Sequence, residues 1–277
     1  MADQVVQIGG HKPGLGGTNR ADKWWTDPII YGAGFFAFVL YTTWAAFQGD
    51  HYWVGSGGYG GYLSPFYSPI LWTHPAPGAA PPAHAWIGMW PSWMPGFIPK
   101  SPALFILVFP LSFRMTCYYY RKFYYRSYFM SPPACAVGGR KHDYRGETRL
   151  FIFQNLHRYA MYFAIIFVGI LYYDAFQAFF RNGKFGVGVG TIILLINPTL
   201  IGAYTFGCHS FRHAIGGKMD CYSGGGTDEL RHKMWKGCTV LNEKHQKWAW
   251  ASLLWVAWTD IYIRLVSTGV FTDYNTW

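Results

Sequence analysis

The chain has 277 residues, of which 51% are hydrophobic, 21% aromatic and only 13% charged, and its 23 Lys and Arg against 13 Asp and Glu give a net charge of +10. Soluble globular chains carry about 25% charged residues, so this composition excludes an ordinary soluble domain, and the apolar content excludes a disordered chain. Five Cys are too few, and odd in number, for a disulfide scaffold. We therefore expect an all-α, polytopic membrane protein.

The N-terminal segment, residues 1–28, is polar and Gly-rich and lacks the apolar centre of a cleavable signal peptide. We expect it to form a cytoplasmic arm. The pair Asp27-Pro28 is a helix-start signal, and residues 29–48 follow it without a charged side chain. Because a spanning helix needs about 20 mostly apolar residues, this segment is the first predicted transmembrane helix.

Four further apolar segments predict a bundle of five transmembrane helices. Pro110 is expected to kink the second helix, and Pro198 lies inside the fourth. The apolar part of the fourth helix contains no charged residue. The fifth carries Asp260 and Arg264 near its far end. The transmembrane domain is predicted over residues 29–272, with the later helices at about 101–125, 150–175, 185–213 and 245–270 and an outer tail at 273–277.

The positions of Lys and Arg predict the orientation of the bundle. With the N-terminus inside, the inner segments 1–28, 114–158 and 209–247 hold 19 of the 23 basic residues. Short cytoplasmic loops are enriched in Lys and Arg, so the net charge indicates membrane topology rather than nucleic-acid binding. The outer segment 49–100 is rich in Gly, Pro and Trp, and we expect it to form an interfacial aromatic belt.

Once this topology is imposed, Cys and His gather on one side. All five Cys fall on the inner side, and Cys or His stand at four helix ends at similar depth. Ionisable side chains at membrane depth are costly, so their placement usually has a functional reason. His209 and His213 are four residues apart and share a face if the fourth helix reaches them. The candidate metal ligands are Cys117, Cys135, Cys208, His157, His209, His213 and His245.

These residue types leave three alternatives open. In one, two His from different helices ligate a haem b. In another, two Cys hold one iron and two His the other iron of a Rieske-type [2Fe-2S] cluster. No C-x-H or C-x-x-H spacing occurs in the chain, so such a cluster would be assembled across helices. In the third, each Cys is a reduced, buried thiol that packs as a small hydrophobic side chain.

Several long runs resemble a known family, the membrane-anchor (cytochrome b-type) subunit of actinobacterial-type succinate dehydrogenases, or complex II. The resemblance covers roughly residues 24–272. The runs are YLSPFYSP (62–69), TCYYYRKFYYRS (116–127), SPPACAV (131–137), GETR (146–149), QNLHRY (154–159), CHSFRH (208–213) and WAWASL (248–253).

The resemblance implies a subunit of the cell (inner) membrane that belongs to a succinate:quinone oxidoreductase of the tricarboxylic acid cycle and respiratory chain. It would dock an iron–sulfur subunit and a flavoprotein subunit, contain no succinate-oxidising site itself, and pass electrons to menaquinone or ubiquinone. The resemblance further implies contact with membrane lipid and a homotrimer of complexes.

The resemblance also favours the Rieske-type [2Fe-2S] cluster over haem b. One iron would take its thiolates from among Cys117, Cys135 and Cys208. The other would take two of His157, His209 and His213, with His245 in reserve. A purely structural anchor with a quinone pocket and no redox centre is the alternative. The implied quinone-binding residues are Arg114, which precedes Cys117 by one helical turn, and Tyr118, Arg158 and Arg212.

Overall fold

The computed structural model describes most of the chain. The described residues are 14–55, 61–73, 85–140, 151–217, 219, 221 and 224–277, and within 151–154 only the backbone is described. Residues 1–13 of the predicted arm and the GETR run (146–149) lie outside these ranges.

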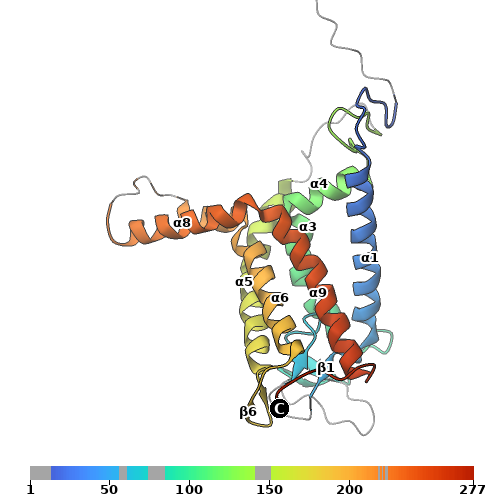
Figure 1. Cartoon of the computed structure of the whole chain (residues 1–277), viewed down its shortest axis with the longest axis vertical. Helices are drawn as coiled ribbons and strands as arrows, with labels where there is room; N and C mark the ends of the chain where they lie inside the picture. The colour runs from blue at the N-terminus through green and yellow to red at the C-terminus, as the bar shows by residue number, and fades with distance from the viewer. Residues whose placement is uncertain are drawn as a thin grey trace, which may run out of the picture.

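Four long helices run along the molecule, as Figure 1 shows. They are α1 (Thr26–Gln48), α5 (Phe151–Gln177), α6 (Val189–Phe206) and α9 (His245–Ser267). α6 packs against both α5 and α9, and the shorter helix α3 (Val108–Thr116) packs against α5. The helical class of the prediction is confirmed.

The two ends of the bundle differ. One end, here called the α8 end, carries α4 (Tyr118–Ser127), α7 (His209–Gly216) and α8 (Thr227–Glu243). Figure 1 labels α4 and α8 there. The opposite end, here called the strand end, carries three two-stranded sheets and the C-terminus (Figure 1). β1 (Trp53–Val54) pairs antiparallel with β2 (Tyr62–Leu63), β3 (Trp72–Thr73) parallel with β4 (Gly88–Met89), and β5 (Phe180–Arg181) antiparallel with β6 (Lys184–Phe185).

Three helices in the described part of the chain are long and apolar enough to cross a membrane: Thr26–Gln48, Asn155–Gln177 and Val189–Phe206. A bent pair of helices, Ala103–Thr116 with Tyr118–Ser127, makes a fourth if it is one span. α9 is not in this set, although its 23 residues would extend about 35 Å at 1.5 Å per residue. The count of five spans and the inside N-terminus therefore stay predictions.

The second predicted helix, 101–125, is divided in the structure into α2 (Ala103–Ile106), α3 (Val108–Thr116) and α4 (Tyr118–Ser127). Pro110 has no N–H to bond the carbonyl of Ile106, and α2 ends at that residue. The larger break is at Cys117, whose ψ of 134° is extended, and the chain bends there by 75°. The prediction of one continuous helix was wrong.

The fourth predicted helix, 185–213, is also divided. α6 ends at Phe206, Cys208 is extended with ψ 139°, and α7 (His209–Gly216) begins after it. Pro198 remains inside α6. The following segment, for which no helix is predicted from the sequence, contains α8 (Thr227–Glu243). α8 projects sideways from the bundle in Figure 1.

The described part of the N-terminal arm lies on the loop that follows α4. The backbone N–H of Gly16 donates to the carbonyl of Gly138 at 2.9 Å, and the N–H of Gly138 donates to Gly17 at 2.8 Å. The guanidinium of Arg20 donates to the carbonyl of Cys135 at 2.8 Å. These bonds hold the arm at the α8 end.

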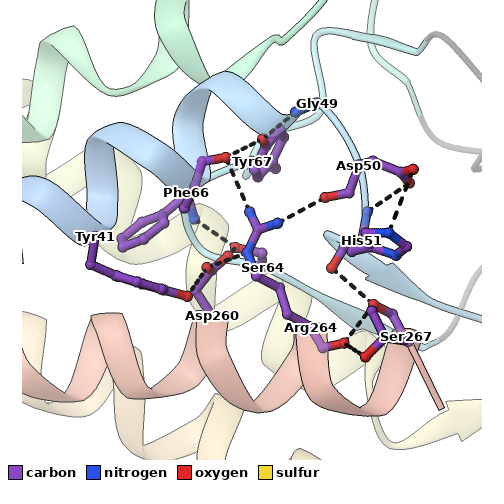
Figure 2. A network of polar contacts seen from close by, with 12 residues as sticks. Tyr41, Gly49, Asp50, His51, Ser64, Phe66, Tyr67, Asp260, Arg264 and Ser267 are labelled. Atoms are coloured by element: carbon purple, nitrogen blue, oxygen red, sulfur yellow. Dashed lines mark hydrogen bonds and ion pairs between the residues drawn. The ribbon is translucent and has the colours of Figure 1, made fainter. Parts of the chain in front are cut away.

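A buried polar network fastens the strand end, as Figure 2 shows. Asp260 of α9 accepts hydrogen bonds from the hydroxyl groups of Tyr41 and Ser64 and forms an ion pair with Arg264. Arg264 also donates to carbonyl oxygens at the end of α1 and in the loop after it. The network therefore ties α9 to α1 and to the loop 49–70.

Two further carboxylates at this end have hydroxyl partners. Asp273 accepts hydrogen bonds from Tyr62 and Tyr262, and Asp174 of α5 accepts one from Ser68. Burial and the neighbouring Asp273 raise the pKa of Tyr62 above its ordinary value, so its phenol stays a donor near neutral pH. Asp174 and Asp260, which the sequence places near the outer helix ends, thus both contact the loop that contains β2.

Candidate functional site

The two helix breaks put two cysteines in equivalent positions. Cys117 is the N-cap of α4 and Cys208 is the N-cap of α7, and their φ and ψ angles are nearly the same. Both are 2% exposed and belong to one apolar cluster. The two helix breaks therefore place both thiols in the same buried cluster.

A helix N-terminus favours negative charge because its backbone N–H groups point outward. Neither thiol makes a hydrogen bond that caps its helix. Each thiol nevertheless stands at the N-terminus of a helix, the end that favours a negative charge.

Two histidines complete the group, one from α5 and one from α9. The Nε2 atom of His157 lies 3.1 Å from the Sγ atom of Cys208, and Nε2 of His245 lies 3.9 Å from Sγ of Cys117. The ring of Phe113, which stacks on His157, lies 5.2 Å by centroid from the ring of Tyr204, which stacks on His245. Four side chains from four parts of the chain therefore meet at the α8 end of the bundle.

Thr116 fixes the orientation of His157. The Thr116 hydroxyl donates to the carbonyl of Ser112 at 2.7 Å, and its oxygen lies 2.8 Å from Nδ1 of His157. With its own hydrogen directed at Ser112, the hydroxyl oxygen accepts from Nδ1–H. That tautomer leaves the lone pair of Nε2 facing Cys208, which is how metal-binding histidines are commonly held.

Aromatic rings enclose the two histidines. The ring of Phe113 stacks on His157 with centroids 4.7 Å apart, and Tyr204 stacks on His245 at 4.9 Å. His245 is buried, and its Nδ1 atom has no hydrogen-bond partner among the described residues. An unpartnered buried imidazole nitrogen is costly, so this site has unused ligand capacity.

The donor set suits a centre with two kinds of ligand. Among the described residues, no group of three or more His, Cys, Asp or Glu is arranged to hold one metal ion. The four side chains instead form two thiol–imidazole pairs, and none of the cysteines concerned is in a disulfide. Two thiolates and two neutral imidazoles are the ligands of a Rieske-type [2Fe-2S] cluster, so the residues present fit that group.

Three other predicted ligands lie apart from this group. His209 and His213 are both on α7 and exposed. Cys135 is exposed in the loop after α4, where a guanidinium nitrogen of Arg126 lies 3.6 Å from its Sγ atom. The fourth helix ends at Phe206, but His209 and His213 are four residues apart on α7 and so still share a helical face.

The predicted quinone-binding residues are spread around the α8 end. Tyr118 is 59% exposed, Arg158 is exposed on α5, and Arg212 lies 4.2 Å from the ring of Trp235. Arg114 is half-buried and donates to Tyr120, Ala249 and Ser252.

Sequence reasoning missed Phe113, Thr116 and Tyr204. Phe113 precedes Cys117 by four residues, and Tyr204 precedes Cys208 by four. An aromatic residue one helical turn before a cysteine in both segments was the available signal, because residues four apart share a helical face. The signal has meaning only when the two cysteines are known to meet.

The chain is similar to known proteins over most of its length. The family model for the actinobacterial succinate dehydrogenase subunit SdhC matches residues 26–269. A chain in the solved structure of the Mycobacterium smegmatis Sdh1 complex in the apo form is 42% identical, with a TM-score of 0.81 and 94% of each chain covered. A comparison with curated protein sequences gave no match.

Proposed function

The chain belongs to the family of actinobacterial succinate dehydrogenase SdhC subunits, and from that premise we propose that it is a redox-active anchor of its complex. In this proposal it receives electrons from an iron–sulfur subunit and delivers them to a quinone. It is a membrane subunit of succinate dehydrogenase, with the apolar helices that such a subunit requires.

The α8 end is the proposed docking face for the soluble subunits. It carries α4, α7 and α8, which together hold seven of the 18 Lys and Arg residues in the described part of the chain. A concentration of Lys and Arg is typical of the cytoplasmic side of a membrane protein. An iron–sulfur subunit bound here would lie next to the four-residue site, and a flavoprotein subunit bound to it would oxidise succinate.

The convergence of Cys117, Cys208, His157 and His245 carries the proposal. We assign the thiolates of Cys117 and Cys208 to one iron and the imidazoles of His157 and His245 to the other iron of a Rieske-type [2Fe-2S] cluster. When bound, the cluster supplies a carrier for one electron at a time. Thr116 holds the tautomer of His157, and the aromatic rings exclude water from the imidazoles.

The quinone would bind beside this site, where Tyr118, Arg158 and Arg212 provide exposed or half-exposed polar groups. Menaquinone and ubiquinone both present carbonyl oxygens that a phenol or guanidinium can contact. The proposed location is the cell membrane, with lipid around the apolar helices and a homotrimer of complexes as the expected assembly. No succinate-oxidising site is proposed in this chain.

Iron analysis and EPR spectroscopy of the purified complex test the proposal. The expected result is a rhombic EPR signal of a [2Fe-2S] cluster with two imidazole ligands, in addition to the signals of the partner's clusters. A Soret band without that signal would favour a bis-His haem b, and the absence of both would favour a purely structural anchor.

Variants assign the ligands. His157→Ala and His245→Ala should each abolish the rhombic signal while the complex still assembles. His209→Ala and His213→Ala are matched controls, because both residues are exposed on α7, and they should retain it. Loss of the signal in the control variants, with retention in the first two, would contradict the assignment.

A further inference from the structure

A half-buried cation next to the four-residue site has no anionic partner among the described residues. Arg114 of α3 directs Nη1 toward the hydroxyl of Tyr120 and the carbonyl of Ala249, and Nη2 toward Ser252, 3.0 Å from its hydroxyl oxygen. All three acceptors are neutral. Within the described residues, no carboxylate lies within ion-pair distance of this guanidinium. By contrast Arg264, the buried arginine at the strand end, is paired with Asp260.

An unpaired charge inside an apolar bundle is costly. Hydrogen bonds to neutral groups and two aromatic rings reduce the cost, since the guanidinium carbon lies 5.6 Å from the ring centroid of Tyr120 and 5.0 Å from that of Tyr204. These contacts hold the cation in place without neutralising its charge. The remaining field of Arg114 is therefore available to a neighbouring anion.

The four-residue site is that neighbour. Cys117 follows Arg114 by three residues, less than one helical turn, and its backbone N–H donates to the carbonyl of Arg114 at 3.2 Å. The ring of Tyr204, which contacts the guanidinium, is stacked on His245 with an angle of 16° between the planes. Arg114, Tyr204 and His245 thus form a continuous stack from the cation to one proposed ligand.

We propose that Arg114 is the fixed positive charge that stabilises the reduced state of the centre held by Cys117, Cys208, His157 and His245. This inference rests on the proposed function. A [2Fe-2S] cluster with two thiolate and two neutral imidazole ligands is uncharged when oxidised and gains a single negative charge with one electron. A cation held beside it favours only the reduced form, because the oxidised form has no net charge to attract.

The consequence is a higher reduction potential than the same ligands would have without the cation. The centre then accepts an electron from the partner's last cluster more readily. The role belongs to the charge and its position, so Lys should largely replace Arg114 and a neutral residue should not. A residue that only filled space or contacted a quinone would not show this dependence.

Redox titration of the purified complex, followed by EPR, tests the proposal. Arg114→Gln should shift the reduced-to-oxidised equilibrium at least tenfold toward the oxidised form, which for a one-electron couple lowers the midpoint potential by about 59 mV. Arg114→Lys should remain closer to the unsubstituted protein. Arg231→Gln is the control for loss of a positive charge, because Arg231 bonds the carbonyls of Ile215 and Gly217 away from the site.

A second variant keeps Arg114 in place. Ser252→Asp puts a carboxylate beside Nη2 and should lower the midpoint potential in the same direction by neutralising the cation. An unchanged midpoint potential in both Arg114→Gln and Ser252→Asp, with the EPR signal intact, would overturn the inference. Absence of the rhombic signal from the unsubstituted complex would instead overturn the proposed function, so the two failures are distinguishable.

Discussion

Arg264 and Asp260 lie one turn apart on α9 and form an ion pair with 2.6 Å between Nε and Oδ2, although their side chains are only 8% and 0% exposed. Asp260 also accepts hydrogen bonds from the hydroxyl groups of Tyr41 and Ser64. The pair lies where α9 meets α1 and the loop containing β2 (Figure 2), so its charges are held by groups that are distant from α9 in the sequence.

Asp260→Asn should therefore be strongly destabilising. The substitution keeps the shape but leaves the buried guanidinium of Arg264 without its anion, which costs about 3–5 kcal/mol in the free energy of unfolding. Thermal unfolding of the detergent-solubilised complex measures the change. Glu229→Gln is the control, because the Glu229–Lys233 pair on α8 is exposed and should contribute about 0.5 kcal/mol or less. Equal effects of the two variants would contradict this prediction.

Tyr41→Phe removes one hydrogen bond to the same carboxylate and little else. Because the acceptor is charged, the expected loss of stability is about 1.5–3 kcal/mol. Tyr172→Phe is the matched control, since that exposed phenol donates to a neutral hydroxyl of Thr199. Thermal unfolding of the solubilised complex again measures the change. A larger loss of stability in Tyr172→Phe than in Tyr41→Phe would show that this prediction is wrong.

Gly190→Ala should loosen the strand end. A Cβ atom at Gly190 would overlap the ring of Tyr62, and the Tyr62 hydroxyl is bound to Asp273. Displacing that ring should cost about 1–3 kcal/mol of stability, as overpacking of a filled core does. Gly34→Ala is the control in α1, where no atom lies within 4 Å of the new Cβ, and helix propensity should make it neutral or stabilising by up to about 1 kcal/mol.

Thr116→Val should weaken the hold on the proposed cluster without removing a ligand. The isosteric change deletes the oxygen that accepts from Nδ1 of His157, and loss of such a partner typically costs about 10–100-fold in metal affinity. The iron content of the complex after mild chelation is the measurement. Thr199→Val, on the exposed side of α6, is the control and should keep its iron. Equal retention in both variants would mean that Thr116 does not orient the ligand.

Local patterns were sufficient for part of the fold. The uncharged run 29–48 predicted α1, and the segments at 150–175 and 245–270 predicted α5 and α9 to within a few residues at each described boundary. The break at Cys117 was not found this way, because no helix breaker stands beside it. The break at Cys208 follows Gly207, the C-cap of α6, which is a local helix-end signal that went unused. α8 was missed because a helix with mixed polar and apolar residues resembles a polar loop in composition.

The sequence by itself determined the class of the protein, its family resemblance and the pool of Cys and His from which a site could be drawn, because composition, charge and sequence runs are properties of the chain alone. The family match confirmed that resemblance. Only the tertiary structure decided which members of the pool meet. The break after α3 and the break after α6 place Cys117 and Cys208 in one cluster, and α5 and α9 bring His157 and His245 to them. His209 and His213, which have the same chemistry, stay exposed because α7 turns away from the bundle.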